Sequence, residues 1–264
     1  MGRQAHSSFN AKNETVAPSA LGITEGHLRN IKGEAVAYEV PRALETHEIP
    51  AIVEDYRKSA ELAKQVGFDG AEIHAANDYL VDLFLQSSTN KRADKYGGSV
   101  ENRTRFLLEI IDAIKTVWPS DRICVRLSPN GAFAQMGGED NVETFTYVFQ
   151  QLNKLNLGYV ALLDGFGFGY HGKCRVVKVF DAKTHFKGNV IATNSYACDT
   201  AEGVVRSGAA DAVGFGRLYI SNPDLAERFQ NGWPLNPDAA NEDYWDSSKG
   251  AQGYTTFPAY TPQP

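Results

Sequence analysis

The sequence of 264 residues predicts an α/β protein with a parallel sheet, and two observations carry this prediction. From residue 50 onward, segments with apolar residues at helical spacing alternate with short apolar runs of strand length. These short runs contain few polar residues, which is typical of parallel strands that are buried on both faces. The regular alternation predicts βα units, and we expect residues 50–232 to consist of them.

The first three predicted helices carry an apolar stripe on one face. The first helix begins near Pro50, because proline suits the opening turn of a helix, and its stripe ends at Gly67. The second spans about residues 101–117 and is stopped by Pro119. Three further helices are predicted over residues 142–155, 175–186 and 200–207.

Five strands are predicted between and after these helices. They cover residues 69–74, 123–127, 159–163, 189–193 and 212–215. A closed (β/α)₈ barrel has eight such strands and a usual size of about 250 residues. We therefore predict a TIM-barrel type of fold, with about five of the eight strands in this chain.

The two flanking regions are expected to lie outside the βα units. Residues 1–49 are polar and contain prolines, and only residues 34–40 alternate weakly like a strand. Residues 233–264 are rich in Pro, Gly, Asn and Asp, which is typical of irregular structure. The expectation is one domain over residues 1–264 that is incomplete at its N-terminal side, with a loop region, a βα region and an irregular tail.

The composition limits the classes of partner. With 26 Lys and Arg against 32 Asp and Glu, the formal net charge is −6, so no basic excess favours nucleic acid. No apolar run approaches the roughly 18 residues of a membrane helix, and no secretory signal opens the sequence. The 3 cysteines form no Cys-x-x-Cys pair, so no metal is predicted. We expect a cytoplasmic protein that binds a small molecule, with a homo-oligomer left open.

Polar side chains follow the first predicted strand, where barrel enzymes hold their active sites. His74 and Asn77 are neutral hydrogen-bond donors that can converge on one oxygen, and Tyr79 adds a phenolic proton within the same turn. Such a set can polarise a carbonyl and deliver a proton. From spacing alone, a core histidine beside a loop-turn asparagine is an equally good interpretation.

A longer pattern surrounds these residues. It opens with His74-Ala-Ala-Asn77-Asp-Tyr79-Leu80 and runs without a gap to Phe106. It continues through Val125-Arg126-Leu-Ser128-Pro129, Ile191-Ala-Thr-Asn194 and Val213-Gly214-Phe-Gly216-Arg217. These segments resemble the old yellow enzyme family of NADH:flavin oxidoreductases, which are FMN-dependent ene-reductases similar to the 12-oxophytodienoate reductases. The resemblance covers nearly the whole chain.

The resemblance implies an NAD(P)H-dependent flavin ene-reductase. In that family FMN takes a hydride from NAD(P)H and passes it to the β-carbon of an α,β-unsaturated carbonyl compound. Carried over by position, His74 and Asn77 would bind the carbonyl oxygen of an enone or enal. Tyr79 would be the catalytic residue that protonates the α-carbon.

The resemblance also implies a set of cofactor-binding residues: Arg126, Asn194, Gly214, Gly216 and Arg217. Arg126 is expected beside the flavin ring, where a positive charge stabilises the anionic reduced form. Gly216 would allow close backbone approach to the phosphate, and Arg217 would bind it. A salt bridge of Arg126 with a neighbouring carboxylate, and a plain turn at the glycines, are the alternatives. Thr193 departs from the family pattern, which often has glycine there.

Two other functions are left open. The family's first three strands precede the Gly-Arg that stands here at Gly2-Arg3, so the chain is expected to lack them and their flavin contacts. The alternative is therefore a truncated, flavin-free family member without catalysis that associates with itself or a partner. A non-redox barrel enzyme such as an aldolase or isomerase is less favoured, because no lysine stands at a convincing strand end.

Overall fold

The computed structural model describes residues 1–167 and 169–261, so the last three residues of the predicted tail lie outside the description. Its centre is a sheet of five parallel strands. They are β5 (Ala71–Ala75), β6 (Ile123–Leu127), β7 (Tyr159–Leu163), β8 (Asn189–Thr193) and β9 (Ala212–Gly214). The bounds of β6, β7 and β8 are those that the sequence predicts.

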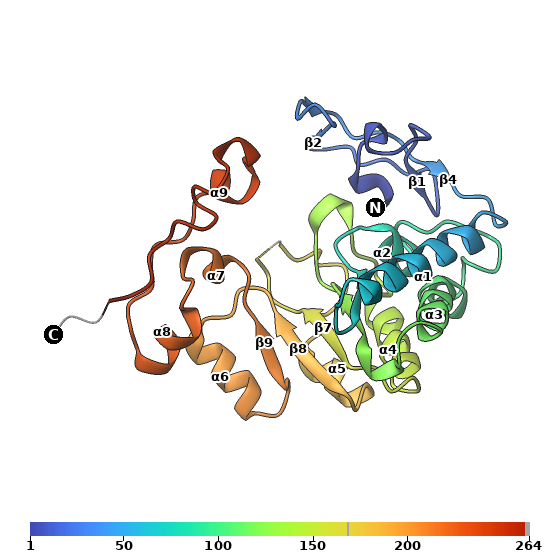
Figure 1. The fold of residues 1–264 in the computed structure, drawn as a ribbon. Helices are drawn as coiled ribbons and strands as arrows, with labels where there is room; N and C mark the ends of the chain where they lie inside the picture. Colours follow the sequence, from blue (N-terminus) through green and yellow to red (C-terminus); the bar gives the residue numbers. More distant parts are fainter. Residues whose placement is uncertain (168, 262–264) are drawn as a thin grey trace.

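The strands lie in the sheet in the order in which they follow along the chain, from β5 to β9. A doubly wound sheet reverses this order at a switch point, and this sheet does not. Right-handed crossovers that all advance in one direction place their helices on one side of the sheet, as in a barrel. Figure 1 shows α3, α4 and α5 on the same side of the strands. The predicted TIM-barrel type of fold is confirmed.

The helices largely follow the predicted ranges. They are α1 (Ile49–Gln65), α2 (Leu80–Leu85), α3 (Val100–Lys115), α4 (Asn141–Leu152), α5 (Val179–His185), α6 (Cys198–Arg206), α7 (Arg217–Ser221), α8 (Leu225–Asn231) and α9 (Asn241–Trp245). Ser99 caps α3, because its side chain accepts a hydrogen bond from the backbone nitrogen of Asn102. The short helices α2, α7 and α8 were not predicted.

Two of the differences from the sequence prediction within the βα region have a clear physical reason. All six residues of α2 are buried, so no polar face marks it as a helix, and the sequence predicts a loop there. Helix α5 begins at Val179 and not near residue 175. Asn130 explains the difference, because its side chain donates to the carbonyl of Val177 at 2.8 Å and accepts from its nitrogen at 2.9 Å. These two hydrogen bonds keep Val177 and the residues before it out of the helix.

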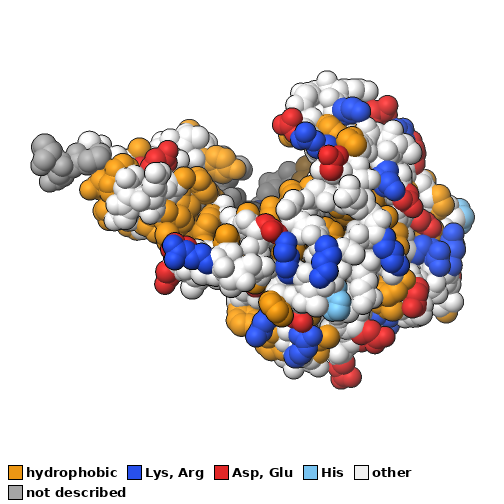
Figure 2. Space-filling model, turned by 90° about the horizontal axis from the view of Figure 1, so that it is seen from below, with side chains coloured by type: hydrophobic (Ala, Val, Ile, Leu, Met, Phe, Trp, Pro, Cys, Tyr) orange, Lys and Arg blue, Asp and Glu red, His pale blue; other side chains and the backbone are white. Residues whose placement is uncertain are grey.

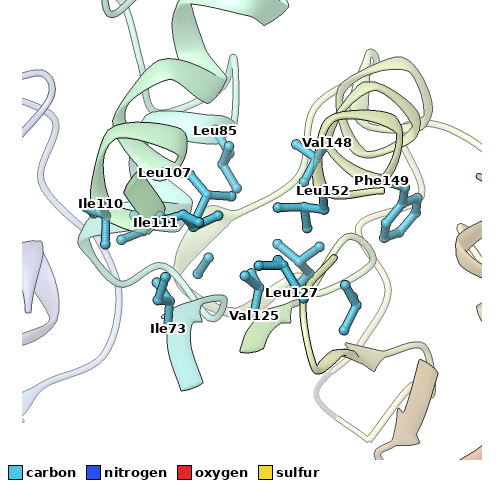
Figure 3. Close-up of a cluster of buried hydrophobic side chains, with 14 of the residues drawn as sticks. Ile73, Leu85, Leu107, Ile110, Ile111, Val125, Leu127, Val148, Phe149 and Leu152 are labelled. Atoms are coloured by element: carbon cyan, nitrogen blue, oxygen red, sulfur yellow. The ribbon is translucent and has the colours of Figure 1, made fainter. Parts of the chain in front are cut away.

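The main core lies between the sheet and the helices that cover it. Figure 3 shows side chains of α3 and α4 facing those of β5 and β6. The labelled members are Ile73, Leu85, Leu107, Ile110, Ile111, Val125, Leu127, Val148, Phe149 and Leu152, all buried. Alternate residues of each strand point to this side, which fixes the other residues of the strand on the opposite face.

The opposite face of the sheet carries polar side chains. Glu72, His74, Arg126 and Tyr159 lie there at alternate strand positions and are exposed or half-buried. The expectation of strands buried on both faces is therefore wrong for this part of the sheet. The reason is that the helices cover only the face of the sheet that points to the main core. These polar side chains are therefore accessible on this face of the sheet.

The flanking regions contain little regular structure. Residues 1–48 form short turns and four two-residue strands: β1 (Val16–Ala17) with β4 (Arg42–Ala43), and β2 (Leu28–Arg29) with β3 (Ala35–Val36). Figure 1 shows this segment beside α1 and α2, whereas the C-terminal part extends away from the sheet. Helix α9 corrects the prediction of a wholly irregular tail. Among the described residues, no helix combines the length and apolarity needed to cross a membrane.

Candidate active site

The imidazole of His74 lies on the accessible face of β5, opposite Arg126 on β6. Burial lowers the pKa of His74 below its ordinary value, and the positive charge of Arg126 lowers it further. The ring is therefore neutral at pH 7. A neutral imidazole donates one hydrogen bond without adding a charge, which suits the role predicted for this residue.

The turn after β5 has an unusual backbone. Asn77 and Asp78 both have positive φ, 57° and 64°, which residues with side chains rarely adopt. The residue that follows β6 supports this conformation, because the nitrogen of Asn77 donates to Oγ of Ser128 at 2.7 Å. The nitrogen of Asp78 donates to Oδ2 of Asp82 at 2.9 Å. The turn is thus held by side chains on both sides.

Tyr79 stands at the end of this turn, immediately before α2. The centres of its ring and of the His74 ring are 4.9 Å apart, and the two planes are inclined by 56°. The turn therefore brings together the predicted proton donor and one of the predicted carbonyl-binding residues. Asn77, half-buried, lies within the same turn.

A groove of about 1080 Å³ lies where β6, β7, β8 and β9 end. All five residues predicted to bind the cofactor line it: Arg126, Asn194, Gly214, Gly216 and Arg217. The volume is at the upper end of the range for small-molecule sites, about 300 to 1,000 Å³. Because Arg126 also faces His74, the groove and the His74–Tyr79 turn are neighbours on one edge of the sheet.

The wall of the groove depends on glycine. Asn194 has a φ of 82°, and its amide donates to the carbonyl of Gly165 at 2.9 Å. A Cβ at Gly165 or Gly167 would collide with Asn194, so the loop after β7 can approach β8 only with glycine there. A Cβ at Gly216 would meet no atom within 4 Å. Contacts within the protein therefore do not require glycine at this position.

These features suit FMN. Arg217 would offer a cation to a phosphate, and its guanidinium reaches the loop at Gly167, where a Cβ would lie 3.3 Å from Nη2. Apolar side chains for a flat ring come from the same groove, among them Phe215 and Leu163. The residues present in the groove thus fit a flavin nucleotide.

Arg126 makes an ion pair within the sheet. Its Nε donates to Oε1 of Glu72 at 2.7 Å, with both side chains about 30% exposed or less. This is the alternative that the sequence left open for Arg126. The same side chain lines the groove, so its contact with a flavin ring stays a prediction.

The family model for NADH:flavin oxidoreductase / NADH oxidase matches residues 1–236. The chain belongs to this family. Members of the family are flavin oxidoreductases that use a nicotinamide hydride donor, and the predicted membership in the old yellow enzyme family is confirmed.

Several relatives illustrate the likeness. The putative 12-oxophytodienoate reductase 11 of Oryza sativa subsp. japonica is 35% identical over 98% of this chain and 70% of its own length. A probable flavin mononucleotide-dependent alkene reductase of Leishmania infantum is 39% identical over 92% of this chain and 66% of its own. These relatives do not favour the flavin-free alternative. The chain spans 58 to 70% of the length of eight curated relatives that it matches.

Solved structures of family members agree with the fold. The old yellow enzyme homologue from Zymomonas mobilis has a TM-score of 0.90 at 36% identity, over 98% of this chain and 72% of that one. Morphinone reductase in complex with tetrahydroNAD has a TM-score of 0.86 at 36% identity, and the match covers 98% of this chain and 70% of that one. A nicotinamide compound is thus bound by one of these family members.

Sequence reasoning missed part of the groove. Trp233, Leu235 and Tyr244 line it, although they belong to the tail that was predicted to be irregular. Apolar side chains gather over this C-terminal part, on the left of Figure 2, and Leu235 is 41% exposed. Aromatic residues within a Pro- and Gly-rich tail are the signal that could have marked them.

Proposed function

We propose that the chain reduces the activated C=C bond of enones or enals, with FMN as cofactor and NAD(P)H as hydride donor. The observation that carries the proposal is the neutral His74 in ring contact with Tyr79, at the edge of a groove lined by Arg126. FMN, when bound, supplies the hydride for the β-carbon. The residues to bind it are Arg126, Asn194, Gly214, Gly216 and Arg217.

The residues of the turn act on the carbonyl side of the substrate. His74 and Asn77 donate hydrogen bonds to the carbonyl oxygen, which gains negative charge as the β-carbon is reduced. One donor of this kind contributes roughly 3 kcal/mol to transition-state stabilisation. Tyr79 then gives its phenolic proton to the α-carbon. Tyr79 is half-buried in this turn.

The substitution Tyr79→Phe tests the assignment. It removes the proton donor but leaves the ring, so we expect alkene reduction to slow by about 10²- to 10⁴-fold while flavin reduction by NADPH keeps its rate. Stopped-flow absorbance of the two half-reactions measures both. Tyr254→Phe, at a side chain that is 65% exposed, is the matched control and should change neither rate. Equal losses in the two half-reactions would refute the role of Tyr79.

The finer properties belong to the same proposal. We expect the protein to act in the cytoplasm, without nucleic-acid or membrane partners. Association into a homo-oligomer stays open. Among the described residues, no group of three or more His, Cys, Asp or Glu side chains is arranged to hold a metal ion.

A further inference from the structure

A buried ion pair lies directly behind the turn that carries Asn77 and Tyr79. Asp78, between them, is completely buried, and Arg3 is 4% exposed. Nε of Arg3 donates to Oδ2 of Asp78 at 2.8 Å, and Nη2 donates to Oδ1 at 2.7 Å. The amide of Gln4 donates to Oδ2 at 2.8 Å. Two charges at this depth are stable only with such complete pairing.

Arg3 also connects the turn to two other segments. Its Nη1 donates to the carbonyl of Leu21 at 3.0 Å, and its Nη2 donates to the carbonyl of Ala134 at 2.9 Å. Leu21 belongs to the N-terminal segment, and Ala134 belongs to the loop after β6. One guanidinium therefore fixes three stretches of chain relative to one another.

The polar contacts continue behind the turn. Asp82 is buried, accepts from the nitrogen of Asp78, and accepts from the amide of Gln86 at 2.9 Å. Oε1 of Gln86 accepts from the nitrogen of Gly137 at 2.8 Å. Burial raises the pKa of Asp82 to about 7, and the nearby charge of Asp78 also raises it. The turn thus rests on a continuous set of buried polar groups.

We propose that Arg3 and Asp78 are positioning residues that set the direction of Asn77 and Tyr79 at the substrate carbonyl. Asp78 holds a φ of 64°, a left-handed conformation that persists only where the surroundings impose it. The bidentate contact with Arg3 supplies that constraint. Neither residue is placed to touch the substrate, so they act through their neighbours in the turn. This inference rests on the function proposed above.

The first test is Arg3→Met in the FMN-loaded protein. A misplacement of about 1 Å can cost about 10²-fold in rate, so we expect alkene reduction to fall toward that extent. Flavin reduction by NADPH should keep its rate. Arg57→Met, which removes ion pairs to Glu54 and Glu61 on the surface of α1, is the matched control and should change neither rate.

The second measurement does not depend on turnover. Hydrogen exchange followed by mass spectrometry should show faster exchange of the turn at residues 76–80 in Arg3→Met, with α3 unchanged. If Arg3→Met unfolds the chain, Arg3→Lys replaces it in both tests, because lysine keeps the charge but not the two parallel contacts. Its turn should exchange faster than in the wild type.

The third measurement is a rescue. Asp78→Gly in the Arg3→Met background removes the unpaired carboxylate and allows the positive φ without a side chain. We expect the double variant to regain protection of the turn and most of the alkene reduction. If Arg3 mattered only through its contacts with Leu21 and Ala134, Asp78→Gly would not restore the turn or alkene reduction.

Two sets of results are distinguishable. If the wild type loaded with FMN reduces no enone, the proposed function fails. The positioning inference is overturned if the wild type reduces enones while Arg3→Met or Arg3→Lys changes neither the rate of alkene reduction nor the hydrogen exchange of the turn. A double variant that is no better than Arg3→Met overturns it as well.

Discussion

At the scale of single residues, the candidate site depends on keeping His74 neutral and Tyr79 beside it. Burial and Arg126 both disfavour the charged imidazole. The centres of the His74 and Tyr79 rings are 4.9 Å apart, so the phenol lies beside the imidazole. In the proposed function, an uncharged hydrogen-bond donor and a proton donor would therefore stand side by side.

The charge state of His74 gives a prediction. Its pKa is lowered from an ordinary value near 6.5, so the ring stays neutral as the pH falls through 6.5 and becomes charged only at lower pH. Any stability linked to the neutral ring is present above its ordinary pKa and is lost as the pH falls through the lowered one. An NMR titration, with His74→Gln to assign the signal, should give a midpoint below 6.5. A midpoint at or above the ordinary value would contradict the account.

At the scale of elements, the sheet edge is supported by the helices packed behind it. Residues of α3 and α4 fill the space behind β5 and β6, so the ends of these strands cannot shift independently of the core. The strands were predictable, because each is a short apolar run between turn residues. Helix α2 was not, because it is buried on all sides and has no polar face. The start of α5 depends on Asn130, a contact across 47 residues that local patterns cannot reveal.

The core of α3 gives the second prediction. Leu107 is completely buried within the main cluster, so Leu107→Ala should lower the free energy of unfolding by about 2 to 5 kcal/mol. Leu62→Ala, at a side chain of α1 that is 61% exposed, is the control, with an expected change within about 0.5 kcal/mol. Urea unfolding followed by circular dichroism measures both. Equal effects of the two substitutions would mean that α3 is not packed as described.

At the scale of the whole molecule, residues far apart in the sequence converge on one edge of the sheet. That His74, Asn77 and Tyr79 lie close together could be predicted because they share one short segment. The five residues expected to bind the cofactor could be named only through the resemblance, since the groove that they line joins the ends of four strands. Trp233 was missed, because only the folded chain brings the tail to the groove, and Tyr244 was left out of the predicted site because the resemblance is loose there. The ion pair of Arg126 with Glu72 was one of two interpretations that the sequence allowed.

The groove gives the third prediction. Arg217→Gln should weaken FMN binding by about 10-fold or more, because a hydrogen bond to a charged group contributes about 1.5 to 3 kcal/mol. Binding of riboflavin, which has no phosphate, should change little. Arg206→Gln, at a side chain of α6 that is 79% exposed, is the control. Flavin fluorescence titration measures each affinity, and equal losses for both flavins would place the phosphate elsewhere.

The most direct test of the proposed activity is a single turnover without oxygen. The protein is loaded with FMN, reduced with one equivalent of NADPH and mixed with cyclohexenone, while absorbance follows the flavin and mass spectrometry follows the ketone. We predict reoxidation of the flavin with formation of one equivalent of cyclohexanone. A protein that retains no FMN, or a reduced flavin that persists beside unchanged cyclohexenone, would contradict the account.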